Sequence, residues 1–280
     1  MKPPLLLIGQ GSHDDAYAAE FGRFVHRLRC RLDHLAADVS GGYLERATPR
    51  LSDSVASLVA RGHHRLVALP LSLSRVSDDF SAAMELEQKR HPTLMYDYGR
   101  PLGPDPRVLA LLAERLNEAA AEISKPARPL ELVGARPRLR AVDTLLEESL
   151  HVEPGETAVV LVGEGSTDAA ANAEVHRVSR LFWEMHAYDF MTVETAFVSV
   201  TPPGVPGGLE RCRRLGAKRV IVVPYLLFAG GMLERVWAQA LAYGAGHPDL
   251  DIRCAEVIGD CETLADVVID RYEEALQFVP

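Results

Sequence analysis

Three polar residues follow apolar runs that are typical of buried strands, and their types suit different chemistry. Gln10 lies between two glycines after LLLIG, Glu164 lies between two glycines after VVLVG, and Arg75 follows LVALPLSLS. A glutamine amide forms hydrogen bonds but takes up no proton at neutral pH, whereas a carboxylate binds cations or accepts a proton, and a guanidinium binds carboxylates. We therefore regard these three residues as the candidate catalytic group.

Residues close to these positions are candidates for contacts with a substrate. His13 would supply an imidazole for metal binding or proton transfer, although a surface histidine at a helix start is the alternative. The acids after Arg75 would add oxygen ligands or would stabilise a helix N-terminus. The candidate substrate-binding residues are Ser12, His13, Asp78, Asp79, Ser166 and Met232. The candidate metal ligands are His13 and Glu164, and the residues alone identify no metal.

The sequence contains an internal repeat. Residues 6–27 and 160–181 both read as an apolar strand, then Gly-X-Gly-Ser-X-Asp, then an Ala-rich amphipathic helix. Gln10 pairs with Glu164 at an offset of 154 residues, and the same offset relates Gly62 to Gly216 and Pro70 to Pro224; Gly103 pairs with Gly259 at an offset of 156. Such a repeat indicates two similar domains.

Strand and helix patterns alternate in both halves. The continuous apolar runs are typical of strands that are covered on both faces, and the helical runs carry apolar residues at three-to-four spacing. This alternation predicts an α/β fold with two similar doubly wound parallel-sheet domains. We expect a first domain over 1–125, a linker over 126–154 and a second domain over 155–280.

Ligands of open parallel sheets bind beyond the carboxyl ends of the strands. We therefore expect the two domains to face a central cleft. The candidate catalytic group would then share one pocket, with Glu164 in reach of a metal, a ligand or Arg75. Ser12 and Ser166 are expected to cap the helices that follow the two turns.

Composition narrows the class of partner. The chain has 280 residues, a formal net charge of −9 and 48% hydrophobic residues. The acidic balance argues against a nucleic-acid partner, and no run approaches the roughly 20 apolar residues that cross a bilayer. The cysteines at 30, 212, 254 and 261 form no CxxC pair, which is typical of reduced thiols in a cytoplasmic protein. The expected partner is a small molecule, and no oligomeric state is indicated.

Several segments resemble the long form of the CbiX-type sirohydrochlorin chelatases. They are LVGEGSTDAAANAEVHRVSRLFWE (161–184), the run from VETAFVSV to GGMLERV (193–236) and, in the first half, YGRPLGP (98–104). This resemblance implies two chelatase-like domains around a tetrapyrrole. It also implies a lyase that inserts Co2+ or Fe2+ into sirohydrochlorin, on the way to cobalamin or sirohaem, with the metal as a substrate.

The sequence departs from that family at two positions. The resemblance implies a histidine between the glycines of the first turn, where this chain has Gln10, and a second histidine near Arg75. The second half offers Glu164 and, roughly, Met232 at the equivalent positions. Glutamine and arginine accept no proton at neutral pH, so the expected bases are replaced.

Three functions remain open. The chain is an active chelatase with rearranged ligands, an enzyme of different chemistry that acts on another small molecule in the same cleft, or a non-catalytic binding protein or partner of an intact chelatase. Loss of a general base removes about 10²–10⁴-fold of rate. We therefore expect slower metal insertion than in a relative that has both histidines.

Overall fold

The computed structural model describes residues 2–11, 14–45, 47–74, 79–121 and 152–277. The first half contains the strands β1 (Leu5–Gly9), β2 (Val39–Tyr43), β3 (Arg65–Pro70) and β4 (Met95–Tyr98), and the helices α1 (Asp15–Leu32), α2 (Leu51–Ala60), α3 (Asp79–Arg90) and α4 (Pro106–Ala121). The second half begins with the short 3₁₀ helix η1 (Pro154–Glu156). It continues with β5 (Thr157–Gly163), α5 (Ala169–His186), β6 (Val193–Phe197), α6 (Val205–Arg214), β7 (Arg219–Pro224), α7 (Gly231–Ala245), β8 (Asp251–Cys254) and α8 (Glu262–Gln277).

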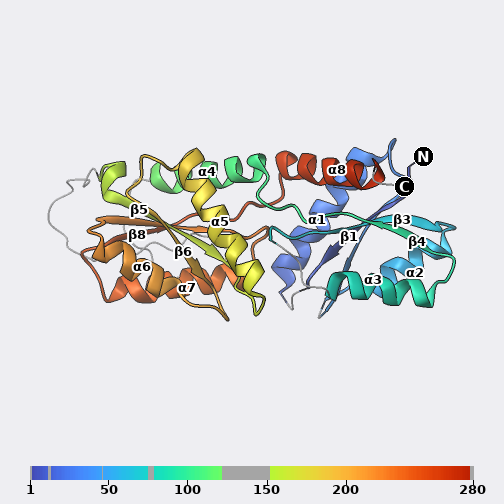
Figure 1. The fold of residues 1–280 in the computed structure, drawn as a ribbon, viewed down its shortest axis with the longest axis horizontal. Coiled ribbons are helices and arrows are strands. Elements are labelled where there is room, and N and C mark those ends of the chain that lie inside the picture. Colours follow the sequence, from blue (N-terminus) through green and yellow to red (C-terminus); the bar gives the residue numbers. More distant parts are fainter. Residues whose placement is uncertain (1, 12–13, 46, 75–78, 122–151, 278–280) are drawn as a thin grey trace. The chain divides into compact units, whose positions relative to one another are not determined.

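The strands form two parallel sheets of four strands, which confirms the predicted duplicated α/β fold. Their orders are β2-β1-β3-β4 and β6-β5-β7-β8, and helices flank both sheets (Figure 1). The register is the same in both, because Ile8 lies opposite Pro70 in one sheet and Val162 lies opposite Pro224 in the other. Residues that lie 154 positions apart in the chain thus occupy equivalent places in the two sheets.

Glycines mark equivalent turns in the two halves. Gly62 and Gly216 have φ values of 88° and 94°, and Gly103 and Gly259 have φ values of 62° and 76°. Side-chain-bearing residues rarely adopt this left-handed conformation. The glycine pairs found in the sequence therefore have a shared backbone role.

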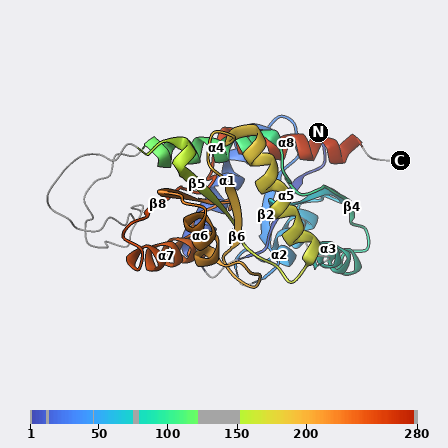
Figure 2. The same cartoon turned by 60° about the vertical axis from the view of Figure 1, so that its left-hand side comes forward.

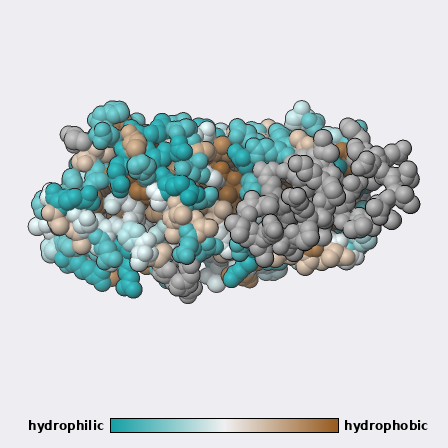
Figure 3. Space-filling model, turned by 180° about the vertical axis from the view of Figure 1, so that it is seen from behind, coloured by the Kyte–Doolittle hydropathy of each residue, from teal (hydrophilic) through white to brown (hydrophobic). Residues whose placement is uncertain are grey.

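The central strands of each sheet are buried. Every residue of β1 and β5 is buried, and so are all residues of β3 and β7 except their first arginines. Parallel strands that are covered on both faces are expected to be apolar throughout. Hydrophilic side chains cover most of the described surface that Figure 3 shows. Within the described ranges, no helix is long and apolar enough to cross a membrane.

The helix caps differ from the predicted ones. Asp14 is the N-cap of α1 and accepts a hydrogen bond from the Ala16 backbone, and Asp168 is the N-cap of α5 and accepts one from Ala170. The capping role predicted for Ser166 is therefore wrong, because that residue lies two positions before the N-cap. Ser12 lies outside the described residues.

The last helix of each half packs with the other half's sheet. The chain divides into unit 1, made of residues 1–108, 227–230 and 259–280, and unit 2, made of 109–226 and 231–258. In unit 1, α8 packs against β3 and β4, and the Tyr272 hydroxyl donates to the Pro3 carbonyl at 2.5 Å. In unit 2, Arg253 donates to the carbonyls of Ala119 and Ala120 at the end of α4. In Figure 2, α4 is coloured green and α8 is coloured red.

This exchange groups residues differently from the expected domains 1–125 and 155–280. Those boundaries stay a prediction about how the chain is organised. Periodicity predicts that a segment is a helix, but it does not say which sheet the helix covers. Only the long-range packing assigns α4 and α8.

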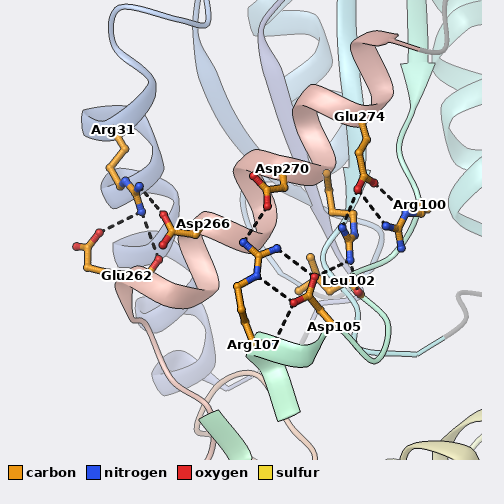
Figure 4. A network of polar contacts seen from close by, with 10 residues as sticks. Arg31, Arg100, Leu102, Asp105, Arg107, Glu262, Asp266, Asp270 and Glu274 are labelled. Carbon is orange, nitrogen blue, oxygen red and sulfur yellow. Dashed lines mark hydrogen bonds and ion pairs between the residues drawn. The ribbon is translucent and has the colours of Figure 1, made fainter. Parts of the chain in front are cut away.

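A network of ion pairs joins α8 to the rest of unit 1 (Figure 4). Asp105 accepts hydrogen bonds from Arg271 at 3.0 Å and from Arg107 at 3.0 Å, and both members of the Arg271–Asp105 pair are buried. Arg107 also contacts Asp270 at 2.8 Å. At the other end of the network, Arg31 of α1 contacts Asp266 at 2.6 Å.

Candidate functional site

In unit 1, a tight turn brings Gln10 beside the end of β2. The Glu45 backbone donates to the Gln10 carbonyl at 3.1 Å. Gly11 has φ = 100°, and a Cβ atom there would lie 1.8 Å from the Glu45 carbonyl oxygen. The backbones of the two loops therefore touch, and only glycine fits between them. The side chains of Gln10 and Glu45 are exposed at this edge.

Unit 2 repeats this turn at Glu164. Ser199 donates its backbone N–H to the Glu164 carbonyl at 3.1 Å, and its hydroxyl donates to the same oxygen at 3.2 Å. Gly165 has φ = 89°, and its Cβ would lie 2.0 Å from the Ser199 carbonyl oxygen. Ser199 is thus the counterpart of Glu45, at the same offset of 154.

Both turns lie where the strand order reverses. The sheets run outward from β1 and β5, each of which lies between the next two strands of the chain, β2 and β3 or β6 and β7. Ligands of doubly wound sheets bind at this reversal, beyond the carboxyl ends of the two central strands. The residue after the third strand of each half continues the pairing with the first strand, because the Leu71 N–H donates to the Ile8 carbonyl and the Tyr225 N–H donates to the Val162 carbonyl, each at 2.8 Å. Gln10 and Glu164 therefore each occupy the expected binding position of their unit.

The Glu164 side chain has no hydrogen-bond or ion-pair partner within the described ranges. Its side chain is exposed to solvent. The pKa of the Glu164 carboxyl is nevertheless raised by desolvation, because protein atoms surround it beyond its immediate contacts. Contact with solvent favours the ionised form and so works against this increase of the pKa. The group is an accessible anion whose proton affinity is increased.

Polar side chains hold the second turn in place. Asn172 of α5 accepts from the Ser166 N–H at 2.9 Å and donates to the Ser166 carbonyl at 2.7 Å. Asn172 also donates to the Thr201 hydroxyl at 3.0 Å, and that hydroxyl donates to Ser166 at 2.8 Å. The Ser166 hydroxyl accepts from the Asp168 N–H at 3.0 Å. Ser166 thus has a structural role, and its predicted contact with substrate stays a prediction.

The other predicted site residues fall into three groups. Asp79 is the exposed first residue of α3, and Met232 is half-buried in the first turn of α7. Gln10 belongs to unit 1 and Glu164 to unit 2, so their predicted shared pocket and the central cleft stay predictions. The predicted site residues that lie outside the described part of the chain are Ser12, His13, Arg75 and Asp78.

Sequence reasoning missed Glu45 and Ser199. Both follow the second strand of their half, and that strand is the direct neighbour of the first. The candidate site residues predicted from the sequence came only from the loops after the first and third strands and from the helix starts that follow them. The shared offset of 154 was a signal that would have paired these two residues, although it did not show their contact with the Gly-X-Gly turns.

No preformed metal centre is found in the part of the chain that the structure describes, where no three His, Cys, Asp or Glu side chains gather.

Comparison with families of known proteins gives one match that spans both halves. The family model for CbiX matches residues 4–119 and again residues 158–275. Each match covers one parallel sheet together with the Gly-X-Gly turn that follows the first strand of that sheet. The duplication seen in the sequence and in the two sheets is therefore a duplication of one family unit.

Curated proteins and solved structures point in the same direction. A sirohydrochlorin cobaltochelatase of Priestia megaterium is 28% identical over 276 residues, covering 98% of this chain and 80% of the relative. A sirohydrochlorin ferrochelatase of the same organism is 25% identical over 235 residues, covering 83% of this chain and 76% of the relative. The structure of SirB from Bacillus subtilis with Fe3+ has a TM-score of 0.71 at 20% identity, covering 98% of this chain and 96% of that one, which is a likeness of fold.

Proposed function

Because the chain belongs to the CbiX family, we propose that it binds a tetrapyrrole of the sirohydrochlorin type and inserts Co2+ or Fe2+ into it. Both metals appear as alternatives because the two Priestia megaterium relatives are a cobaltochelatase and a ferrochelatase. The metal is a substrate in this reaction. The proposal draws support from a family match in both halves and from similarity along nearly the whole chain.

Metal insertion requires a proton acceptor. A divalent ion that enters the macrocycle displaces two protons from pyrrole N–H groups, and these protons must be taken up by a base. The histidine that the family resemblance implies between the glycines of the first turn is Gln10 here, and an amide takes up no proton at neutral pH. Among the described residues of the two turns, a carboxylate is then the available base.

Glu164 is the group best suited to this role. Its carboxylate is exposed at the carboxyl end of β5 and has no partner in the described part of the chain. Desolvation raises its pKa, and a carboxylate with a raised pKa is a stronger proton acceptor. The observation that best supports this rearranged site is thus the Glu164 carboxylate. It has no partner among the described residues, and it lies at the expected binding position of the second half. Glu45 supplies a further carboxylate at the equivalent edge of the first half.

Substitution of Glu164→Gln tests the proposal. The amide keeps the size of the side chain but accepts no proton, so we expect the rate of Co2+ insertion into sirohydrochlorin to fall by about 10²-fold or more. Absorbance of the macrocycle follows the reaction, and a titration without metal measures the dissociation constant of the macrocycle. We expect that dissociation constant to change by much less than the rate.

The matched control is Glu184→Gln, which changes an exposed acid at the other end of α5. Glu184 pairs only with Arg180 on the same helix, so both the rate and the binding should be unchanged. An unaltered insertion rate in Glu164→Gln would exclude Glu164 as the base. Failure of the parent protein to insert either metal would exclude the chelatase function itself.

A further inference from the structure

The loop after β6 contains an unusual backbone conformation. Val200 has φ = 64° and is the one residue other than glycine with a positive φ in the described ranges. A β-branched side chain is poorly accommodated there, because its branches crowd the backbone. The side chain is also 68% exposed, so packing in the interior does not explain why a valine adopts this conformation.

Hydrogen bonds from several elements hold the conformation. Ser199 is fixed to the Glu164 carbonyl by its N–H and its hydroxyl, and Thr201 is fixed to Ser166 and to Asn172. On the preceding side, Gln239 of α7 donates to the Val198 carbonyl at 3.1 Å. Val200 is therefore held between two anchored neighbours, directly beside the Glu164 turn.

Strain and exposure together need an explanation. A single exposed apolar residue is common on protein surfaces and carries no meaning by itself. Leu215 is such a residue: it is 58% exposed at the end of α6, and its φ of −75° is relaxed. Val200 has strain in addition, and such strain concentrates at ligand contacts and active sites.

We infer that Val200 is a ligand contact of the second half, and that its side chain packs against the flat apolar face of the macrocycle beside Glu164. The inference rests on the proposed function, because it takes its ligand from there. The side chains of Val200 and Glu164 suit different parts of such a ligand. An isopropyl group covers ring surface, and a carboxylate accepts hydrogen bonds from ring N–H groups.

The test uses Val200→Asn in the full chain. Asparagine tolerates the left-handed conformation and is polar, so it relieves the strain and removes the apolar contact. We expect the melting temperature of the ligand-free protein to rise by about 2–4 °C, and the Kd for metal-free sirohydrochlorin to increase by about tenfold. Val200→Leu keeps an apolar side chain and should bind with a Kd close to that of the parent.

Leu215→Asn is the matched control, since it makes the same change at a relaxed exposed residue. It should not raise the melting temperature, and it should leave the Kd for sirohydrochlorin unchanged. A parent-like Kd in Val200→Asn would overturn the contact while leaving the proposed function intact. A melting temperature at or below that of the parent would show that Val200 is not strained and would also overturn the inference. A parent protein that does not bind sirohydrochlorin would overturn both.

Discussion

At the scale of single residues, the two halves differ in the side chain that follows their first strand. Gln10 and Glu164 occupy equivalent turns, each closed by a glycine that touches the neighbouring loop. The backbone of the turn is therefore the same for an amide and for an acid. We therefore expect a substitution at either position to leave the local fold unchanged.

Substitution of Gln10→His should increase the rate of metal insertion. The imidazole would restore a proton acceptor at the position where the family resemblance implies one, and a positioned base contributes about 10²–10⁴-fold. Initial rates measured from the absorbance of sirohydrochlorin with Co2+ check this outcome. Gln10→Asn is the control, because it keeps an amide and should give no increase. A histidine variant as slow as the parent would show that the missing base does not limit the reaction.

At the scale of elements, α8 is attached to unit 1 by a buried ion pair. Burial alone would raise the pKa of Asp105, but the hydrogen bond from Arg107 and the charge of Arg271 outweigh it, so the pKa lies below its usual value. A lowered pKa in the folded state means that the ionised form stabilises the fold. This contribution is complete above the pKa of the unfolded chain, about 3.9, and is lost as the pH falls through the folded value.

Substitution of Asp105→Asn should lower the free energy of unfolding by about 3 kcal/mol at pH 7, because it removes the buried ionic partner of Arg271 and leaves that guanidinium the more exposed Glu274 as its ionic partner. The difference between variant and parent should begin to shrink below about pH 4, where Asp105 of the unfolded chain takes up a proton, and should be lost as the pH falls through the lower pKa of folded Asp105. Urea denaturation at several pH values measures both effects.

Asp270→Asn is the matched control in the same network. The Asp270 side chain is 50% exposed, and the loss of an exposed ion pair costs about 1 kcal/mol or less. An equal loss of stability in both variants would contradict the special role of the buried pair.

At the scale of the whole molecule, the halves exchange their last helices. Unit 1 contains α8 from the end of the chain, and α4 of the first half belongs to unit 2. Each sheet therefore needs a helix from the other half to complete its cover. We therefore expect that neither half of the duplicated family unit folds independently of the other.

This exchange predicts the behaviour of separated halves. A chain of residues 1–121 lacks α8, so the faces of β3 and β4 that α8 covers would be exposed, and we expect it to be unstable or aggregated when expressed alone. Co-expression with residues 152–280 should yield a folded complex of the two pieces. Affinity purification through a tag on one piece, followed by circular dichroism, checks the result. A stable, monomeric 1–121 piece would contradict the need for α8.

The sequence by itself determined the features that depend on local pattern and on repetition. Apolar runs and helical spacing predicted the α/β class and the parallel strands, and the offset of 154 residues paired Gln10 with Glu164 and Pro70 with Pro224. These features follow from the sequence because side-chain periodicity decides which segments form strands and helices.

Only the tertiary structure decided which distant segments meet. It assigned α8 to the first sheet, placed Ser199 against the Glu164 turn and imposed a positive φ on Val200. It also replaced the predicted serine caps by Asp14 and Asp168. Contacts between segments far apart in the chain arise from packing and hydrogen bonding that no local pattern records, because the same helix or loop can satisfy its pattern against many different surfaces.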